Sequence, residues 1–150
     1  MSEPALGERP RKRHFRGRDA THKYATLKYM AMDPTIIDPA ALARLEEWGG
    51  PKLSNEIMRL FLENGPTRMD QVRTALTGSD LDLAERGAHS LKSSAANIGA
   101  EEVRRIANDV EIASSEGQLQ RVRELLPDLE EAFSLAIREL EMNAETSNEA

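Results

Sequence analysis

The sequence predicts an all-α protein, an antiparallel up-down-up-down four-helix bundle with a short capping helix at its N-terminal end. Three observations predict this fold class. Ala, Leu, Glu and Arg dominate the 150 residues and aromatic residues make up only 4%, a composition typical of helical chains. Apolar residues recur three and four apart, without a convincing strand alternation. The connections between these apolar segments are short, which favours antiparallel neighbours.

The capping helix is predicted to begin at Asp38 and Pro39. A carboxylate at the N-cap followed by proline at the first helical position is a helix start. The glycine pair Gly49-Gly50 ends this short element. Its apolar residues lie three apart and are Leu42, Leu45 and Trp48.

The first long helix of the bundle is predicted over residues 53–77. Its apolar residues at helical spacing are Ile57, Met58, Phe61, Leu62, Met69, Val72 and Leu76. Gly65-Pro66 lies in the middle, so this segment is either kinked or two helices in sequence. The sequence TGSD at 77–80 predicts the end of this helix followed by the N-cap of the next one.

Three further helices are predicted. The first spans about 81–98 and Gly99 ends it, the second begins immediately afterwards and stops at Gly117, and the third spans about 118–141. Pro127 either bends the last helix or restarts it. The expected inward residues are, in chain order, Ala84, Ala88, Leu91, Ala95 and Ile98; then Val103, Ile106, Ala107, Val110 and Ala113; then Leu119, Val122, Leu126, Leu129, Phe133, Ala136 and Leu140.

The charge distribution divides the chain. Residues 1–29 hold eight Lys/Arg against three Asp/Glu, a net charge of +5, whereas residues 30–150 hold twelve against twenty-three, a net charge of −11. We expect a basic, disordered tail over 1–29, a helical bundle over 36–142 and a disordered C-terminal tail over 143–150. The basic tail is either solvated, an upstream extension of a chain that starts at Met30 or Met32, or an arm for nucleic acid or an anionic membrane.

Several function classes lack their motifs. The sequence has no cysteine, so it offers no disulfide, thiol nucleophile or thiolate metal site. It contains no apolar run of membrane-spanning length, no signal-peptide pattern, no Gly-rich phosphate loop and no nucleophile elbow. We therefore expect a cytoplasmic protein that uses no cofactor or metal of its own and does not enter a membrane.

The third helix carries His89 on the face opposite its apolar stripe, because positions three and four apart share a face. That face holds Asp82, Glu85, Arg86, His89, Lys92, Ser93 and Ala96. The imidazole is therefore predicted to point outward, beside a cation, on a patch of small residues that a second protein could approach.

Glu111 is predicted to lie level with His89. The turn near Gly99 has His89 about ten residues before it and Glu111 about eleven after it, and both helices rise roughly 1.5 Å per residue. The carboxylate could reach the imidazole or Lys92. A carboxylate on one imidazole nitrogen fixes the tautomer and leaves the other nitrogen as a nucleophile.

Spacing alone leaves the role of His89 open. An exposed histidine on a helix is commonly polar surface. A metal site has weaker support, since Glu85 and His89 lie four apart but no third strong ligand is in view. A hydrolase would need a pocket that excludes water, and the patch looks convex.

The stretch AHSLKSSAANIGA, residues 88–100, closely resembles the signature of histidine-containing phosphotransfer (HPt) domains of multistep phosphorelays, roughly H-x-L-K-G/S-S-[AS]-x-x-[LI]-G-A. The resemblance extends over about residues 36–140, from IIDPAALARL through EIMRLFLENGPTRMDQVRTALTGSDLDLAERGAHSLK to IANDVE. It implies the family's helical bundle and a role in two-component signal transduction.

The resemblance also implies residue roles. His89 would accept the phosphoryl group, Lys92 would help to neutralise its charge, and Glu111 would orient the imidazole. Ser93 stands where the family more commonly has glycine, and remains small enough for a partner to approach. The partner-docking face would be formed by Arg86, Ser93 and Ala96.

The function implied is a phosphorelay carrier that takes a phosphoryl group from a receiver-domain aspartate and passes it to another receiver aspartate. It would not be an enzyme on its own, because in the family the receiver supplies Mg²⁺ and most catalytic groups. We expect response-regulator receiver domains as partners, with a hybrid histidine kinase as a further candidate, a monomer, and no nucleic-acid binding beyond the hint in the basic tail. The alternative is an HPt-like binding module that docks on a receiver or kinase without carrying phosphate.

Overall fold

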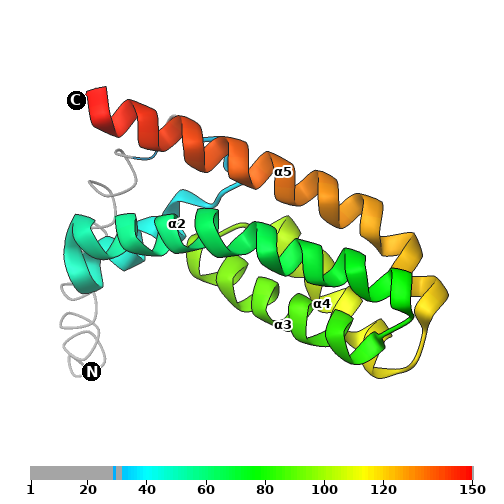
Figure 1. Ribbon diagram of the computed structural model, residues 1–150. Helices are drawn as coiled ribbons and strands as arrows, with labels where there is room; N and C mark the ends of the chain where they lie inside the picture. Colours follow the sequence, from blue (N-terminus) through cyan, green and yellow to red (C-terminus); the bar gives the residue numbers. More distant parts are fainter. Residues whose placement is uncertain (1–28, 30–31, 150) are drawn as a thin grey trace, which may run out of the picture.

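The computed structural model describes residue 29 and residues 32–149 of the chain. Within these residues the elements are the helices α2 (Pro39–Gly78), α3 (Leu81–Ile98), α4 (Glu101–Ser115) and α5 (Leu119–Glu149), and no strand occurs among them. Figure 1 shows the helices running back and forth side by side, with α5 projecting past the ends of α3 and α4. The predicted all-α bundle is confirmed.

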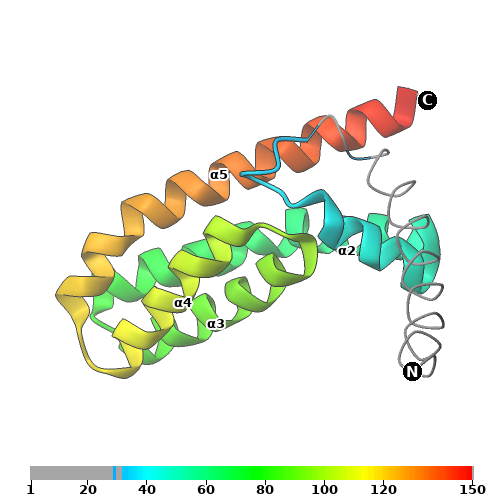
Figure 2. The same cartoon turned by 180° about the vertical axis from the view of Figure 1, so that it is seen from behind.

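The bundle is held together by the apolar faces that the spacing predicts. α3 packs against both α2 and α4, while α5 packs against α4 and, less extensively, against α2; the view from behind in Figure 2 shows α4 between α3 and α5. All ten predicted inward residues of α3 and α4 are buried, and so are Val122, Leu129, Phe133, Ala136 and Leu140 of α5. Burying such side chains stabilises the fold by about 1.5–3 kcal/mol for each large one.

One non-helical residue divides α2. Gly50 has φ +72° and ψ −176°, and Pro51 starts the helix again, so the segment before it is the capping helix and the segment after it is the long bundle helix. Gly65-Pro66 does not break the helix, and the prediction of two helices there is wrong. The lack of a side chain at Gly65 instead leaves room for the Phe133 ring, because an added Cβ would lie only 2.8 Å from the nearest ring carbons.

The capping helix sits on the turn between α3 and α4. The Asp38 amide donates to the Gly99 carbonyl at 2.9 Å. Gly99 has φ +80°, and an added Cβ would lie 2.7 Å from both the Ala41 Cβ and the Asp38 carbonyl oxygen. The spacing placed Trp48 with the apolar residues of this helix, but this residue is 80% exposed. The bundle covers the start of the helix, where Ala41, Leu42 and Ala43 are buried, and not its end.

Both ends of the bundle differ from the predicted boundaries. Tyr29, which we assigned to the basic tail, is buried, and its hydroxyl donates to the buried Ser54 Oγ at 3.3 Å. Residues 1–28 lie outside the described residues.

The last helix is longer than predicted. α5 runs as one helix through Pro127, so the predicted possibility that the helix restarts there is wrong, and it continues to Glu149. The tail expected over 143–150 is therefore helical as far as residue 149, because no Gly or Pro follows Pro127 to end the helix.

Candidate functional site

The exposed histidine is placed by α3. Asp80 begins this helix, with its Oδ1 accepting from the Leu83 amide at 3.1 Å, and Gly99 ends it in the left-handed conformation. The buried stripe on the opposite face fixes the rotation of the helix about its axis. The His89 side chain is consequently 62% exposed, as the spacing predicts.

Close packing of α2 and α3 occurs next to this histidine. Gly87 is buried against α2, and an added Cβ would lie 3.2 Å from the Arg68 carbonyl oxygen, the Gln71 Cβ and the Val72 Cγ2. The absence of a side chain at Gly87 thus brings the α2 backbone against α3, two residues before His89. Sequence analysis did not single out this glycine.

Glu111 of α4 connects the imidazole and the lysine. Its Oε1 lies 3.0 Å from the His89 Nδ1, and its Oε2 lies 2.7 Å from the Lys92 Nζ. The side chains of Glu111 and Lys92 are only 20% and 28% exposed. The structure therefore brings together His89, Lys92 and Glu111, the three residues predicted to take part in phosphoryl transfer. The spacing allowed Glu111 to reach the imidazole or Lys92, and it contacts both.

The electrostatics favour the ionised form of this carboxyl. Burial raises the pKa of Glu111, but hydrogen bonds from Lys92 and then His89 outweigh burial and hold that pKa below its usual range. Glu111 is thus a carboxylate at neutral pH and acts as an acceptor. It favours a proton on the Nδ1 of His89, so the lone pair is on Nε2.

A groove of about 380 Å³ lies between α2 and α3, with His89 on its wall. Its lining residues are Ile57, Leu60, Phe61, Asn64, Arg68, His89, Ser90, Ser93, Ser94 and Asn97. Among the predicted docking residues, Ser93 lines this groove. Arg86 and Ala96 are exposed on the same side of α3 but do not line it.

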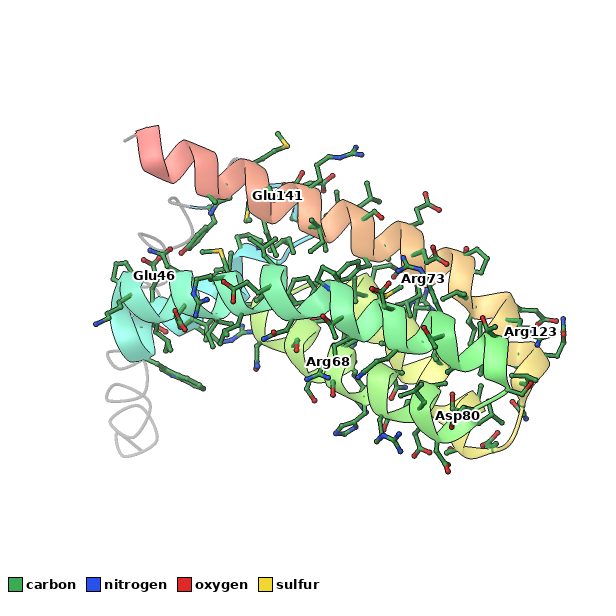
Figure 3. The ribbon with its side chains drawn as sticks, viewed as in Figure 1. Glu46, Arg68, Arg73, Asp80, Arg123 and Glu141 are labelled. Carbon is green, nitrogen blue, oxygen red and sulfur yellow. The ribbon has the colours of Figure 1, made fainter. Side chains whose placement is uncertain are left out.

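The α2 side of this groove was expected only as exposed apolar residues of the second helix, and its polar residues Asn64 and Arg68 were not predicted. Figure 3 shows Arg68 on the side of α2 that faces α3, and Asp80 at the connection between the two helices. Arg68 lies twelve residues before Asp80 and His89 nine residues after it, so the rise per residue of two antiparallel helices would place them at similar heights. Sequence alone gives no reason to choose this residue among the basic residues of α2.

The described part of the chain offers neither a metal-binding cluster nor a membrane-spanning helix. Residues 29 and 32–149 contain no group of three or more His, Cys, Asp or Glu arranged to hold a metal ion. None of the helices described is both long and apolar enough to span a bilayer.

Comparison with known proteins identifies the fold and the family. A family model described as the Hpt domain matches residues 56–145, more than half of the chain. The crystal structure of histidine-containing phosphotransfer protein B (HptB) from Pseudomonas aeruginosa PAO1 has a TM-score of 0.66 with this chain at 24% sequence identity, over 75% of this chain and 96% of that one. At this identity the likeness shows the fold alone. No curated protein matches the chain in sequence.

Proposed function

Because the chain belongs to the histidine-containing phosphotransfer (HPt) domain family, we propose that His89 accepts a phosphoryl group from a receiver-domain aspartate and passes it to an aspartate of another receiver. One observation carries this proposal: an exposed imidazole has its Nδ1 3.0 Å from the Glu111 carboxylate. That contact leaves the Nε2 lone pair facing away from the carboxylate.

The transfer is a displacement at phosphorus. The Nε2 lone pair of His89 forms the new P–N bond while the P–O bond of the aspartyl phosphate breaks and the aspartate leaves as a carboxylate. The Nδ1 proton remains hydrogen-bonded to Glu111, whose negative charge stabilises the positive charge that develops on the ring. Onward transfer to a second aspartate reverses these bond changes.

Lys92 contributes a positive charge next to the reacting imidazole. Its ammonium is 2.7 Å from Glu111 Oε2, so it compensates a buried oxygen of that carboxylate and fixes its orientation. We propose that Mg²⁺ and the remaining catalytic groups come from the partner receiver, and that the protein alone is a carrier rather than an enzyme.

The partner would dock over the face that surrounds His89. The small or polar residues Arg86, Ser93 and Ala96 are exposed there, and Ile57 and Leu60 line the adjoining groove. A modest surface of this kind suits transient exchange. We propose that the protein acts as a monomer in the compartment that contains its receivers, the cytoplasm.

Incubation with a phosphorylated receiver tests the proposal. We expect acid-labile phosphate on the wild-type protein and none on His89→Gln. His22→Gln is the matched control, because it removes one of the two other histidines of the chain, His14 and His22. Equal labelling of His89→Gln would exclude His89 as the acceptor.

The second candidate is a binding module that docks on a receiver or kinase without carrying phosphate. The groove beside His89 supports this binding module, because a partner could dock on its lining residues without any reaction at the imidazole. In this case His89→Gln would bind the receiver with unchanged affinity and leave signalling intact. A carrier predicts unchanged affinity with loss of signalling.

A further inference from the structure

Arg68 is a second cation on the groove that His89 lines, and it comes from α2. It is half-buried and lines the same groove as His89. In the described part of the chain Arg68 has no hydrogen bond or ion pair, whereas six of the other basic residues pair with carboxylates: Arg59, Arg73, Lys92, Arg104, Arg105 and Arg121. The charge of Lys92 is already engaged by Glu111, and that of Arg68 is free.

The packing of the two helices directs the Arg68 side chain towards the histidine. The Arg68 backbone lies against Gly87. Side chains on a helix lean towards its N-terminus, and α2 runs antiparallel to α3. Leaning towards the N-terminus of α2 therefore carries the guanidinium along α3 from Gly87 towards Ser90 and Ser93, past His89. Figure 3 shows Arg68 on this side of α2, whereas Arg73 lies on the side of α5.

The orientation of the imidazole places Nε2 away from α4. Nδ1 is held by Glu111 on α4, and the groove that His89 lines is on the other side of α3, between α3 and α2. A phosphoryl group bonded to Nε2 thus lies at the mouth of this groove.

The groove itself is suited to an anion. Residues 30–150 carry a net charge of −11, yet none of the ten lining residues is Asp or Glu. Besides Arg68, hydrogen-bond donors are available from Asn64, Ser93 and Asn97. Guanidinium groups and phosphoryl oxygens form short, strong, charge-assisted hydrogen bonds.

We propose that the groove between α2 and α3 is a phosphoryl subsite, in which the Arg68 guanidinium binds the phosphoryl oxygens on Nε2 of phosphorylated His89 while Lys92 stays paired with Glu111. Arg68 is thus the principal cation for the phosphoryl group, and Lys92 holds the carboxylate that orients the ring. This subsite rests on the proposed function, because it requires that His89 carries phosphate.

A donor without a receiver separates this role from docking. Phosphoramidate gives its phosphoryl group to His89: its P–N bond breaks, ammonia leaves and the P–Nε2 bond forms. We expect Arg68→Gln to be labelled about tenfold more slowly than the wild type and Arg68→Lys to be intermediate. Arg138→Gln is the control for lost positive charge, because Arg138 lies in a different groove, between α2 and α5, and we expect its labelling to be unchanged.

Nuclear magnetic resonance of the wild-type protein gives a readout that does not depend on a variant that folds. With ¹⁵N-labelled arginine, the Nε–Hε signal of Arg68 should shift on phosphorylation by phosphoramidate or by a receiver that is then removed. The Arg138 signal should stay in place, and no signal should shift in His89→Gln.

The outcomes distinguish the two levels of the proposal. If the wild type is labelled on His89 but the Arg68 signal does not move and Arg68→Gln is labelled at the normal rate, the subsite is wrong and the carrier function stands. If Arg68→Gln slows only transfer from a receiver, Arg68 serves docking and the subsite is again wrong. If no donor labels His89, the carrier function fails and the subsite fails with it.

Discussion

The Nδ1 of His89 lies 3.0 Å from the Oε1 of Glu111, twenty-two residues further along the chain. The two residues come from different helices, α3 and α4, and meet because the turn at Gly99 brings the chain back antiparallel. This contact determines which imidazole nitrogen is free to react, so it links the fold of the hairpin to the proposed chemistry.

Replacing Glu111 by alanine should release the imidazole. Without the carboxylate both neutral tautomers of His89 become populated, and we expect phosphoryl transfer to slow by about tenfold. ¹⁵N chemical shifts of the ring measure the tautomers, and a labelled receiver measures the rate. Glu116→Ala is the control, since Glu116 is exposed at the end of α4. Unchanged tautomer populations in Glu111→Ala would contradict the orienting role.

Replacing Lys92 by methionine should destabilise the fold. Glu111 Oε2 is buried, and Lys92 is the cation paired with it. Losing that cation leaves the buried Oε2 without its partner while His89 still contacts Oε1, so we expect the free energy of unfolding to fall by about 1–3 kcal/mol. Urea titration measures the change. In the double variant with Glu111→Gln the penalty should be smaller than the sum of the two single penalties, and strict additivity would show that the pair is not coupled.

The stability of the protein should depend on the ionisation of Glu111 at acidic pH. Its pKa in the folded protein is lowered, whereas an unfolded glutamate has a pKa of about 4.3. A lowered folded pKa means that the carboxylate stabilises the fold above the unfolded pKa, and that this contribution is lost as pH falls through the folded pKa.

Comparison of the wild type with Glu111→Gln isolates that contribution, because glutamine does not ionise. The difference in their free energies of unfolding should be constant from pH 7 to about pH 5 and should shrink below that. Denaturant titrations at several pH values measure it. A difference that grows as the pH falls would mean that the sign of the shift is wrong.

Alanine at Gly99 should cost much more stability than alanine at Gly117. Both glycines have positive φ, +80° and +76°, but a Cβ at Gly99 would collide with Ala41 and Asp38 while a Cβ at Gly117 would meet nothing. We expect about 1 kcal/mol for Gly117→Ala from backbone strain alone, and at least about 3 kcal/mol for Gly99→Ala, which adds the steric collision. Similar losses of thermal stability in the two variants would contradict the close packing of the capping helix on the turn.

Much of the fold was predictable because it depends on local periodicity. The stripe from Ala84 to Ile98 fixes both the existence of α3 and the face that it buries, and the short connection at Gly99 makes α4 its antiparallel neighbour. The prediction was wrong where a distant residue decides the outcome. Gly65-Pro66 has the composition of a helix break, but Gly65 is buried against the Phe133 ring and the helix continues through it.

By itself, the sequence determined the helices, the outward direction of His89 and the level of Glu111, since each follows from residue spacing along one helix or across one short turn. The tertiary structure decided what spacing cannot express. It placed Tyr29 in the core and Trp48 in solvent, engaged Lys92 and His89 with the same carboxylate, and brought Arg68 from α2 into a groove beside the imidazole. These outcomes depend on how side chains from different helices share space and charge, and that is set only when the helices pack together.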